Sequence, residues 1–194
     1  ALFVAIRAGL VIVNTNPLYT PREMKHQFND SGAIAIVIVA NFAFNLEKVL
    51  PDCPQMKHII VTELGDMLGF PKKQIVNFMV SKVKKMVPAY SLPSMVKFSK
   101  ALAIGAKAEY YKPKMLNSEL AFIQYTGGTT GVSKGAMLSH RNLIANLEAN
   151  TVWQTTIMEE ITDEKIVVVA ALPLYHVYAL TINALSGIKL GVMN

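Results

Sequence analysis

Short uncharged apolar runs alternate along this chain with segments patterned as helices, and this alternation constrains the fold more than any other feature. Ile34–Val39 is rich in β-branched residues and carries no charge, which predicts a strand covered on both faces. Strands are also expected over Leu10–Val13, Lys57–Thr62, Leu120–Gln124 and Ile166–Leu172. Strands joined through helices form a parallel sheet with right-handed crossovers. The sequence therefore predicts an α/β fold with a mostly parallel sheet flanked by helices.

The most clearly marked helix begins after Thr20. Thr20 is the expected N-cap, Pro21 occupies the first helical position, and Glu23 completes a capping box. Gly32 is expected to end this helix. Further helices are expected over residues 1–8 and 42–50, from an N-cap at Ser139 through Asn150, and from Leu174 onward.

Composition indicates a globular protein with a substantial core. The chain has 194 residues, of which 52% are hydrophobic and 16% charged, so it is not a disordered polymer. Its longest apolar run, Ala33–Ala40, is far shorter than the roughly 20 residues that a membrane span needs. A single cysteine, Cys53, is typical of a reducing compartment, so the cytoplasm is the expected location.

The segment between Asp66 and Glu109 contains eight lysines and no acidic residue. Within it, Lys72–Val87 fits an amphipathic helix with an apolar stripe opposite its lysines, and Phe78 is the one misfit on the polar side. One interpretation is a helix that packs its stripe on the sheet. The other is a membrane-surface segment over 67–108, whose lysines would each gain ~1 kcal/mol near anionic headgroups. Nucleic acid is disfavoured as a partner, because arginines and interleaved aromatic residues are few.

The glycine-rich segment 125–135 carries most of the functional information. It reads Tyr125-Thr126-Gly127-Gly128-Thr129-Thr130-Gly131-Val132-Ser133-Lys134-Gly135. Glycines let backbone N–H groups approach an anion, threonine hydroxyls donate hydrogen bonds to phosphate oxygens, and lysine supplies a positive charge. The pattern predicts a phosphate-binding loop region over 120–140. The alternative is a glycine-rich hairpin with solvated hydroxyls.

This segment does not match the pattern of P-loop NTPases. Ser133 precedes Lys134 where that pattern needs glycine, and Gly135 follows where Ser or Thr would hold magnesium. The spacing T-G-G-T-T-G-x-x-K-G instead resembles the signature loop of the adenylate-forming enzymes. That superfamily includes acyl-CoA synthetases, luciferases and the adenylation domains of peptide synthetases.

The resemblance implies a set of residues that bind the ATP phosphates: Tyr125, Thr126, Gly127, Gly128, Thr129, Thr130, Gly131 and Lys134. In such enzymes a carboxylate attacks the α-phosphorus of ATP and pyrophosphate leaves, so donors and a cation at the phosphates carry much of the catalysis. Lys134 and Thr126 are the expected catalytic residues, and Thr126 is also a candidate ligand for Mg²⁺. No general base is required, because a carboxylate is ionised at neutral pH.

A second motif, Leu172-Pro173-Leu174-Tyr175-His176, resembles the next signature segment of the same superfamily. In that segment an aromatic or histidine residue lines the pocket for the acyl group and the thiol, which makes His176 the candidate pocket residue. The alternative is that His176 caps the last helix through a backbone hydrogen bond.

The resemblance extends over essentially the whole chain. Asn14–Glu23, Lys134–Asn142 and Leu172–Asn183 are similar to bacterial long-chain fatty-acid–CoA ligases. This similarity implies the acyl-CoA synthetase/luciferase-like fold and a two-step reaction, in which ATP and a long-chain fatty acid give acyl-AMP and coenzyme A then gives the thioester. It also implies Mg²⁺ as the cofactor and allows a homodimer. Two alternatives stay open: an adenylating ligase for another carboxylic acid, and a basic module that binds the membrane surface.

The same similarity implies that residues 1–194 are a central fragment of a large N-terminal AMP-binding domain. Residues 67–110 would be a basic helical insertion in it. The chain begins without methionine, and neither a Gly-Tyr-Gly-x-Thr-Glu nor a Thr-Gly-Asp segment follows His176. The C-terminal domain with its catalytic lysine is likewise expected to be absent. We therefore expect the isolated fragment to be inactive.

Overall fold

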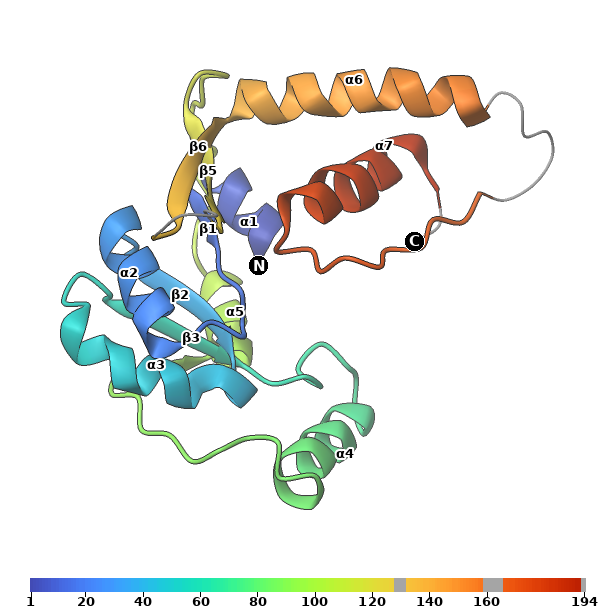
Figure 1. The fold of residues 1–194 in the computed structure, drawn as a ribbon. Helices are drawn as coiled ribbons and strands as arrows, with labels where there is room; N and C mark the ends of the chain where they lie inside the picture. The colour runs from blue at the N-terminus through green and yellow to red at the C-terminus, as the bar shows by residue number, and fades with distance from the viewer. Residues whose placement is uncertain (128–131, 159–165, 193–194) are drawn as a thin grey trace. The chain divides into compact units, whose positions relative to one another are not determined.

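The computed structural model describes residues 1–127, 132–158 and 166–192 (Figure 1). The chain forms two compact units: a first unit of Ala1 with Pro17–Lys112, and a second unit of Leu2–Asn16 with Pro113–Asn194. Each unit contains a three-stranded sheet, with strand order β2-β3-β4 in the first and β1-β5-β6 in the second. The predicted α/β class is confirmed, and three of the four strand pairs are parallel.

The first unit alternates strands and helices, as predicted for residues 20–62, whereas the strand at 96–97 and the helix at 98–105 were not predicted. Its elements are α2 (Pro21–Ser31), β2 (Ala35–Val39), η1 (Ala40–Phe42), α3 (Ala43–Val49), η2 (Leu50–Asp52), β3 (His58–Thr62), α4 (Lys72–Phe78), η3 (Met79–Val83), β4 (Val96–Lys97) and α5 (Phe98–Gly105). Strand β3 lies between β2 and β4 and is parallel to both.

The predicted capping box of α2 is present. The Thr20 backbone N–H and hydroxyl donate to Glu23 Oε2 at 2.8 and 2.7 Å, and the Glu23 N–H donates to Thr20 Oγ1. Hydrogen bonds from the side chain and backbone of Thr20 lower the pKa of the Glu23 carboxyl. Gly32 ends the helix in the left-handed conformation, with φ 65°. The start and end of α2 therefore follow from local interactions alone.

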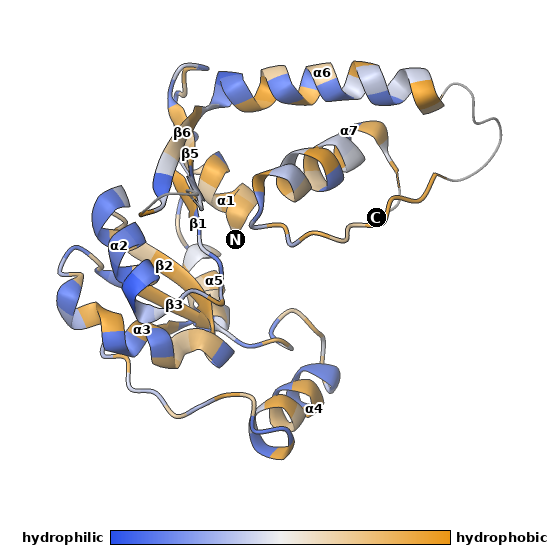
Figure 2. Cartoon of the chain, viewed as in Figure 1, coloured by the Kyte–Doolittle hydropathy of each residue, from blue (hydrophilic) through white to orange (hydrophobic). Residues whose placement is uncertain are grey.

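Helices α2 and α3 contribute Met24, Phe28, Leu46 and Val49 to a core that also contains Ile38, Ile59 and Val61 of β2 and β3. Figure 2 shows both strands as mainly hydrophobic. Because strand side chains alternate between faces, Val37 lies on the face opposite Ile38, and it is 46% exposed. The prediction that residues 34–39 are covered on both faces is therefore wrong: the two helices cover the face that carries Ile38.

The basic segment 67–110 is helical in two stretches, α4 with η3 and α5, and it also supplies β4 to the sheet. The first helix ends at Val83, whereas the sequence predicted an end at Val87. Lys85 has φ 49°, a left-handed conformation that interrupts a right-handed helix, and Pro88 follows shortly after.

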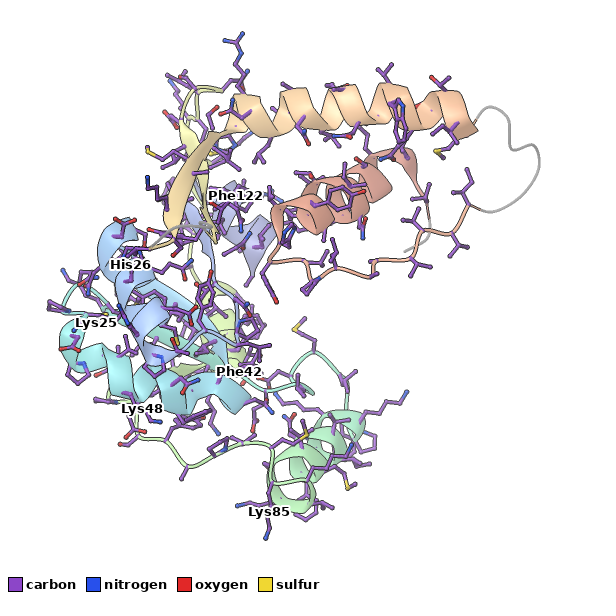
Figure 3. All side chains as sticks on the ribbon, in the orientation of Figure 1. Lys25, His26, Phe42, Lys48, Lys85 and Phe122 are labelled. Carbon is purple, nitrogen blue, oxygen red and sulfur yellow. The ribbon has the colours of Figure 1, made fainter. Side chains whose placement is uncertain are left out.

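The second unit contains α1 (Leu2–Arg7), β1 (Ile12–Asn14), β5 (Leu120–Thr126), β6 (Lys134–Ser139), α6 (His140–Met158), η4 (Ala179–Ser186) and α7 (Gly187–Leu190). Its core centres on Ala121, Phe122 and Leu180 (Phe122 is labelled in Figure 3). Ser139 caps α6 as predicted: its Oγ accepts the Asn142 N–H at 3.2 Å, and the Ser139 N–H donates to Asn142 Oδ1 at 2.9 Å. The helix continues to Met158 rather than ending at Asn150, because no glycine or proline interrupts it.

The prediction of a buried strand at Ile166–Leu172 is wrong. These residues form an isolated bridge at Val167 and no strand, and Val169 is 83% exposed. A uniformly apolar, β-branched run favours extended backbone but does not specify a pairing partner. Among the described residues, nothing extends the pairing beyond Val167.

Candidate functional site at the loop end of the β5–β6 hairpin

The glycine-rich segment connects β5 to β6, which pair as antiparallel neighbours with Tyr125 opposite Gly135 and Thr126 opposite Lys134. A P-loop instead connects a strand to a helix, so this connection differs from a P-loop. The hairpin connection is compatible with a phosphate cradle, because such a cradle needs only open backbone N–H groups and hydroxyls. Four of the predicted phosphate-binding residues lie outside the described residues: Gly128, Thr129, Thr130 and Gly131.

The pairing brings the two predicted catalytic residues together. Residues directly opposite in an antiparallel pair project to the same face, with Cβ atoms about 4.5–5.5 Å apart. Thr126 and Lys134 form the last such pair before the connection, and both are exposed. Within the described part of the chain, no ion pair involves Lys134. A hydroxyl and an ammonium group therefore lie side by side at the loop end of the hairpin.

Gly127 follows Thr126 at this end of the hairpin. It is exposed, and a Cβ added there would meet no atom within 4 Å, so the backbone at this position is accessible to a ligand. Gly127, Thr126 and Lys134 are the predicted phosphate ligands whose surroundings the structure describes as open.

Tyr125 is different, because its side chain is buried, with 6% of its surface exposed. Its ring lies against Gly135: a Cβ added at Gly135 would lie 3.0 Å from Tyr125 Cζ and 2.6 Å from Ile123 Cγ2. The structure thus gives the Tyr125 side chain a packing role, in which it closes over Gly135, the second residue of β6. The role of Gly135 was not predicted, because its position opposite Tyr125 depends on the register of the hairpin.

Gln124 is a buried polar residue that the sequence analysis missed. Only 8% of it is exposed, and both ends of its amide are bonded: Asn14 Nδ2 donates to Gln124 Oε1 at 3.2 Å, and Gln124 Nε2 donates to the Tyr175 carbonyl at 3.1 Å. It thereby joins the end of β1, the strand before the glycine-rich connection, and the turn that carries His176. The available signal was an amide within an apolar strand, since buried polar groups require partners.

His176 caps the last helix. Its Nδ1 accepts the Tyr178 N–H at 3.3 Å, its carbonyl accepts the Leu180 N–H at 3.0 Å, and the residue is exposed. An accepting Nδ1 places the proton of the neutral ring on Nε2, which is then a donor. The expectation that His176 follows a strand is wrong, because residues 166–172 form none. The hydrogen bond from Gln124 to Tyr175 is what links this turn to β5.

A groove of about 430 Å³ lies between α6 and the last helix. It is lined by Leu138, Asn142, Leu143, Asn146, Asn150, Val177, Tyr178, Thr181 and Ile182. Asn142, Asn146 and Asn150 recur every four residues, so they share one side of α6. The sequence predicted α6 only as a helix, and no motif indicated this groove.

The described residues fit Mg²⁺ only in part. Within 1–127, 132–158 and 166–192, no group of three or more His, Cys, Asp or Glu side chains could hold a metal ion. Mg²⁺ bound by nucleotide-dependent enzymes takes most of its ligands from phosphate and water, with one or two from the protein. The exposed hydroxyl of Thr126 is suitable as one such ligand.

Replacing Gln124 with leucine should loosen the turn that carries His176. The change removes the hydrogen bond from Gln124 to the Tyr175 carbonyl and the one that Gln124 accepts from the Asn14 amide, which costs about 1–3 kcal/mol. In the full-length protein we expect amide exchange in residues 173–180 to become at least about fivefold faster. Gln74→Leu, at an exposed glutamine, is the matched control. Unchanged exchange in Gln124→Leu would contradict the linking role.

Replacing Gly135 with alanine should distort the hairpin. The added methyl overlaps Ile123 and Tyr125, and overpacking of this kind costs about 1–3 kcal/mol. We expect a lower thermal unfolding midpoint than wild type, measured by scanning fluorimetry. Gly105→Ala is the control, since a Cβ there meets nothing within 4 Å. Equal midpoints for the two variants would show that the ring of Tyr125 does not close over Gly135.

All 194 residues match one protein family, described as AMP-binding enzyme. Over 194 residues the chain is 53% identical to a long-chain-fatty-acid–CoA ligase of Escherichia coli O6:H1 and 52% identical to one of Salmonella typhimurium, covering 100% of this chain and 34% of each relative. It is 32% identical over 185 residues to the ligase of the same description from Bacillus subtilis. The chain thus spans about a third of the length of these relatives.

Two solved structures show the same fold. A red-emitting luciferase from Phrixothrix hirtus matches 96% of this chain and 31% of its own, with a TM-score of 0.63 and 21% identity. The apo structure of MbtA from Mycobacterium smegmatis matches 100% of this chain and 30% of its own, with a TM-score of 0.63 and 22% identity. These matches confirm the predicted luciferase-like fold. Together with the family match over its full length, they show that the chain belongs to the AMP-binding enzyme family.

Proposed function

We propose that the protein containing this chain activates long-chain fatty acids with ATP to give acyl-AMP, and then transfers the acyl group to coenzyme A. The observation that supports this most is the pairing of Thr126 with Lys134 at the end of the hairpin that carries the glycine-rich connection. The 53% identity to a long-chain-fatty-acid–CoA ligase over the whole chain favours a long-chain acid over other carboxylic acids. Residues 1–194 would be a central part of the large N-terminal domain of that enzyme, and inactive by themselves.

In the first step a carboxylate oxygen attacks the α-phosphorus, and the bond from phosphorus to the bridging oxygen of pyrophosphate breaks. Negative charge grows on the leaving pyrophosphate, where positioned donors and a cation lower the barrier most effectively. In our proposal the Lys134 ammonium balances this charge, and the Thr126 hydroxyl and Gly127 N–H donate to phosphate oxygens. The same proposal gives phosphate contacts to Gly128, Thr129, Thr130 and Gly131, and a backbone contact to Tyr125.

Mg²⁺ would enter with ATP and neutralise part of the phosphate charge, with Thr126 as a protein ligand. His176 would line the pocket for the acyl group and the thiol, and its Nε2–H would serve as a donor there. The cap through Nδ1 supports this role, because it fixes both the orientation and the tautomer of the ring.

The remaining partners follow from the same proposal. The protein would act in the cytoplasm on ATP, a long-chain fatty acid and coenzyme A, as a homodimer at full length, and without a nucleic-acid partner. Peripheral contact with the inner face of the membrane through segment 67–108 would bring it to a substrate that partitions into lipid. No helix of the described residues is long and apolar enough to cross a membrane.

Lys134→Ala tests the assignment of the phosphate site. Loss of one group that stabilises the transition-state charge typically slows an enzyme by about 10²–10³-fold, and we expect a reduction of at least about 100-fold. The measurement is fatty-acid-dependent exchange of pyrophosphate into ATP by the full-length protein. Lys114→Ala, at an exposed lysine of the same unit, should exchange at the wild-type rate. Wild-type exchange by Lys134→Ala would refute the assignment.

A further inference from the structure

The helix formed by α4 and η3 is held to the first unit by its polar side. Asn77 Oδ1 accepts the Gly65 N–H at 2.7 Å, and Asn77 Nδ2 donates to Glu63 Oε2 at 3.1 Å. Ser81 lies on the same side and donates to the Asn77 carbonyl at 2.7 Å. These bonds fix which side of the helix faces the unit.

An ion pair adds to this attachment. Lys73 Nζ lies 2.9 Å from Asp66 Oδ1, and the Asp66 side chain is buried. Burial alone raises the pKa of Asp66, but hydrogen bonds from the Glu63 N–H, Lys73 and Thr62, with the charge of Lys73, bring it below its ordinary value. Asp66 therefore stays ionised at neutral pH, and the pair with Lys73 persists.

The opposite side of the helix is apolar and faces away from the unit. Ile75, Phe78, Met79 and Val83 are all exposed, Phe78 to 60%. Three further apolar residues beside the helix are exposed as well: Met67, Phe70 and Met86. We call these seven residues the apolar face. Figure 2 shows hydrophobic and hydrophilic residues alternating along α4.

In this orientation Ile75, Met79 and Val83 of the predicted apolar stripe are exposed, so these three residues do not pack on the sheet. The polar side chains turn inward because Glu63, Gly65 and Asp66 offer them partners. Phe78, the misfit of the sequence pattern, is one of the exposed apolar residues.

Lysines surround the apolar face. Lys72, Lys82, Lys84 and Lys85 are exposed, and Figure 3 shows Lys85 extending from the end of the helix. No acidic residue occurs between Asp66 and Glu109 to offset them, and Asp66 itself is paired with Lys73. Exposed apolar side chains gathered on one side of a helix favour an interaction surface. Lysines are depleted in protein–protein interfaces, whereas apolar residues flanked by lysines are typical of helices that lie in a membrane interface.

We propose that the apolar face docks on an anionic lipid bilayer. Its apolar side chains would enter the boundary between headgroups and acyl chains, while the lysines, whose long stems let the charge reach outward, would meet the lipid phosphates. The bonds of Asn77 and Lys73 would hold the helix in this orientation in the absence of lipid. This deepens the peripheral contact proposed above by naming the surface, and it does not depend on catalysis.

The test is flotation of the full-length protein with vesicles of phosphatidylcholine alone or mixed with phosphatidylglycerol, at low and high salt. One variant carries Ile75→Ser and Phe78→Ser, and the other carries Lys82→Glu, Lys84→Glu and Lys85→Glu. We expect binding to the anionic vesicles that weakens at high salt, and at least about tenfold weaker binding for each variant.

Matched controls separate local from general effects. Val152→Ser replaces an apolar residue of α6 that is 69% exposed, and a triple variant reverses the exposed Lys57, Lys112 and Lys114. Both controls should bind vesicles as wild type does. Ligase activity on detergent-dispersed fatty acid, measured in parallel, should be unchanged in every variant, so failure of docking and failure of the proposed enzyme activity are read independently.

Several outcomes would overturn the proposal. Equal binding to neutral and anionic vesicles, or equal loss in variants and controls, would exclude this surface. Salt-sensitive binding to a DNA duplex without vesicle binding would identify another partner. Ile75→Ser with Phe78→Ser could also lower the unfolding temperature or dissociate an oligomer while vesicle binding stays intact. That result would show that the apolar face is covered by protein.

Discussion

The backbone ladder between β5 and β6 determines which side chains meet at the loop end of the hairpin. Because strand side chains alternate, a slip of one residue would turn Lys134 away from the face that carries Thr126. Gly135 protects this register, since only a residue without Cβ lets the ring of Tyr125 close over β6. The proposed phosphate site thus depends on a packing contact that itself touches no ligand.

Gln124 extends this dependence beyond the hairpin. It lies two residues before Thr126, on the same face of β5, and its amide bonds the ends of two other segments. The buried amide can be satisfied only when β1 and the turn before the last helix are both in place. The orientation of His176 and the position of the glycine-rich connection are therefore coupled through one side chain.

Local interactions were predictable from the sequence, and long-range ones were not. The capping box joins Thr20 and Glu23, which are three residues apart, and β2 and β3 follow from their own composition, whereas the two-residue strand β4 does not. The partners of Gln124 lie 110 and 51 residues away, so no local pattern could reveal them. The helix at 72–83 has a clear amphipathic pattern, but its orientation depends on Glu63 and Asp66. Residues 166–172 have the composition of a strand, yet a strand also needs a partner.

We propose above all that the loop end of the β5–β6 hairpin binds the phosphates of ATP. Hydrogen–deuterium exchange of the full-length protein, with and without ATP and Mg²⁺, tests this most directly. We expect ATP to slow exchange at residues 124–135, whereas exchange in the α4–η3 helix at 72–83 should stay as it is without ATP. Binding of ATP with unchanged exchange at 124–135, and protection located elsewhere in the protein, would contradict it.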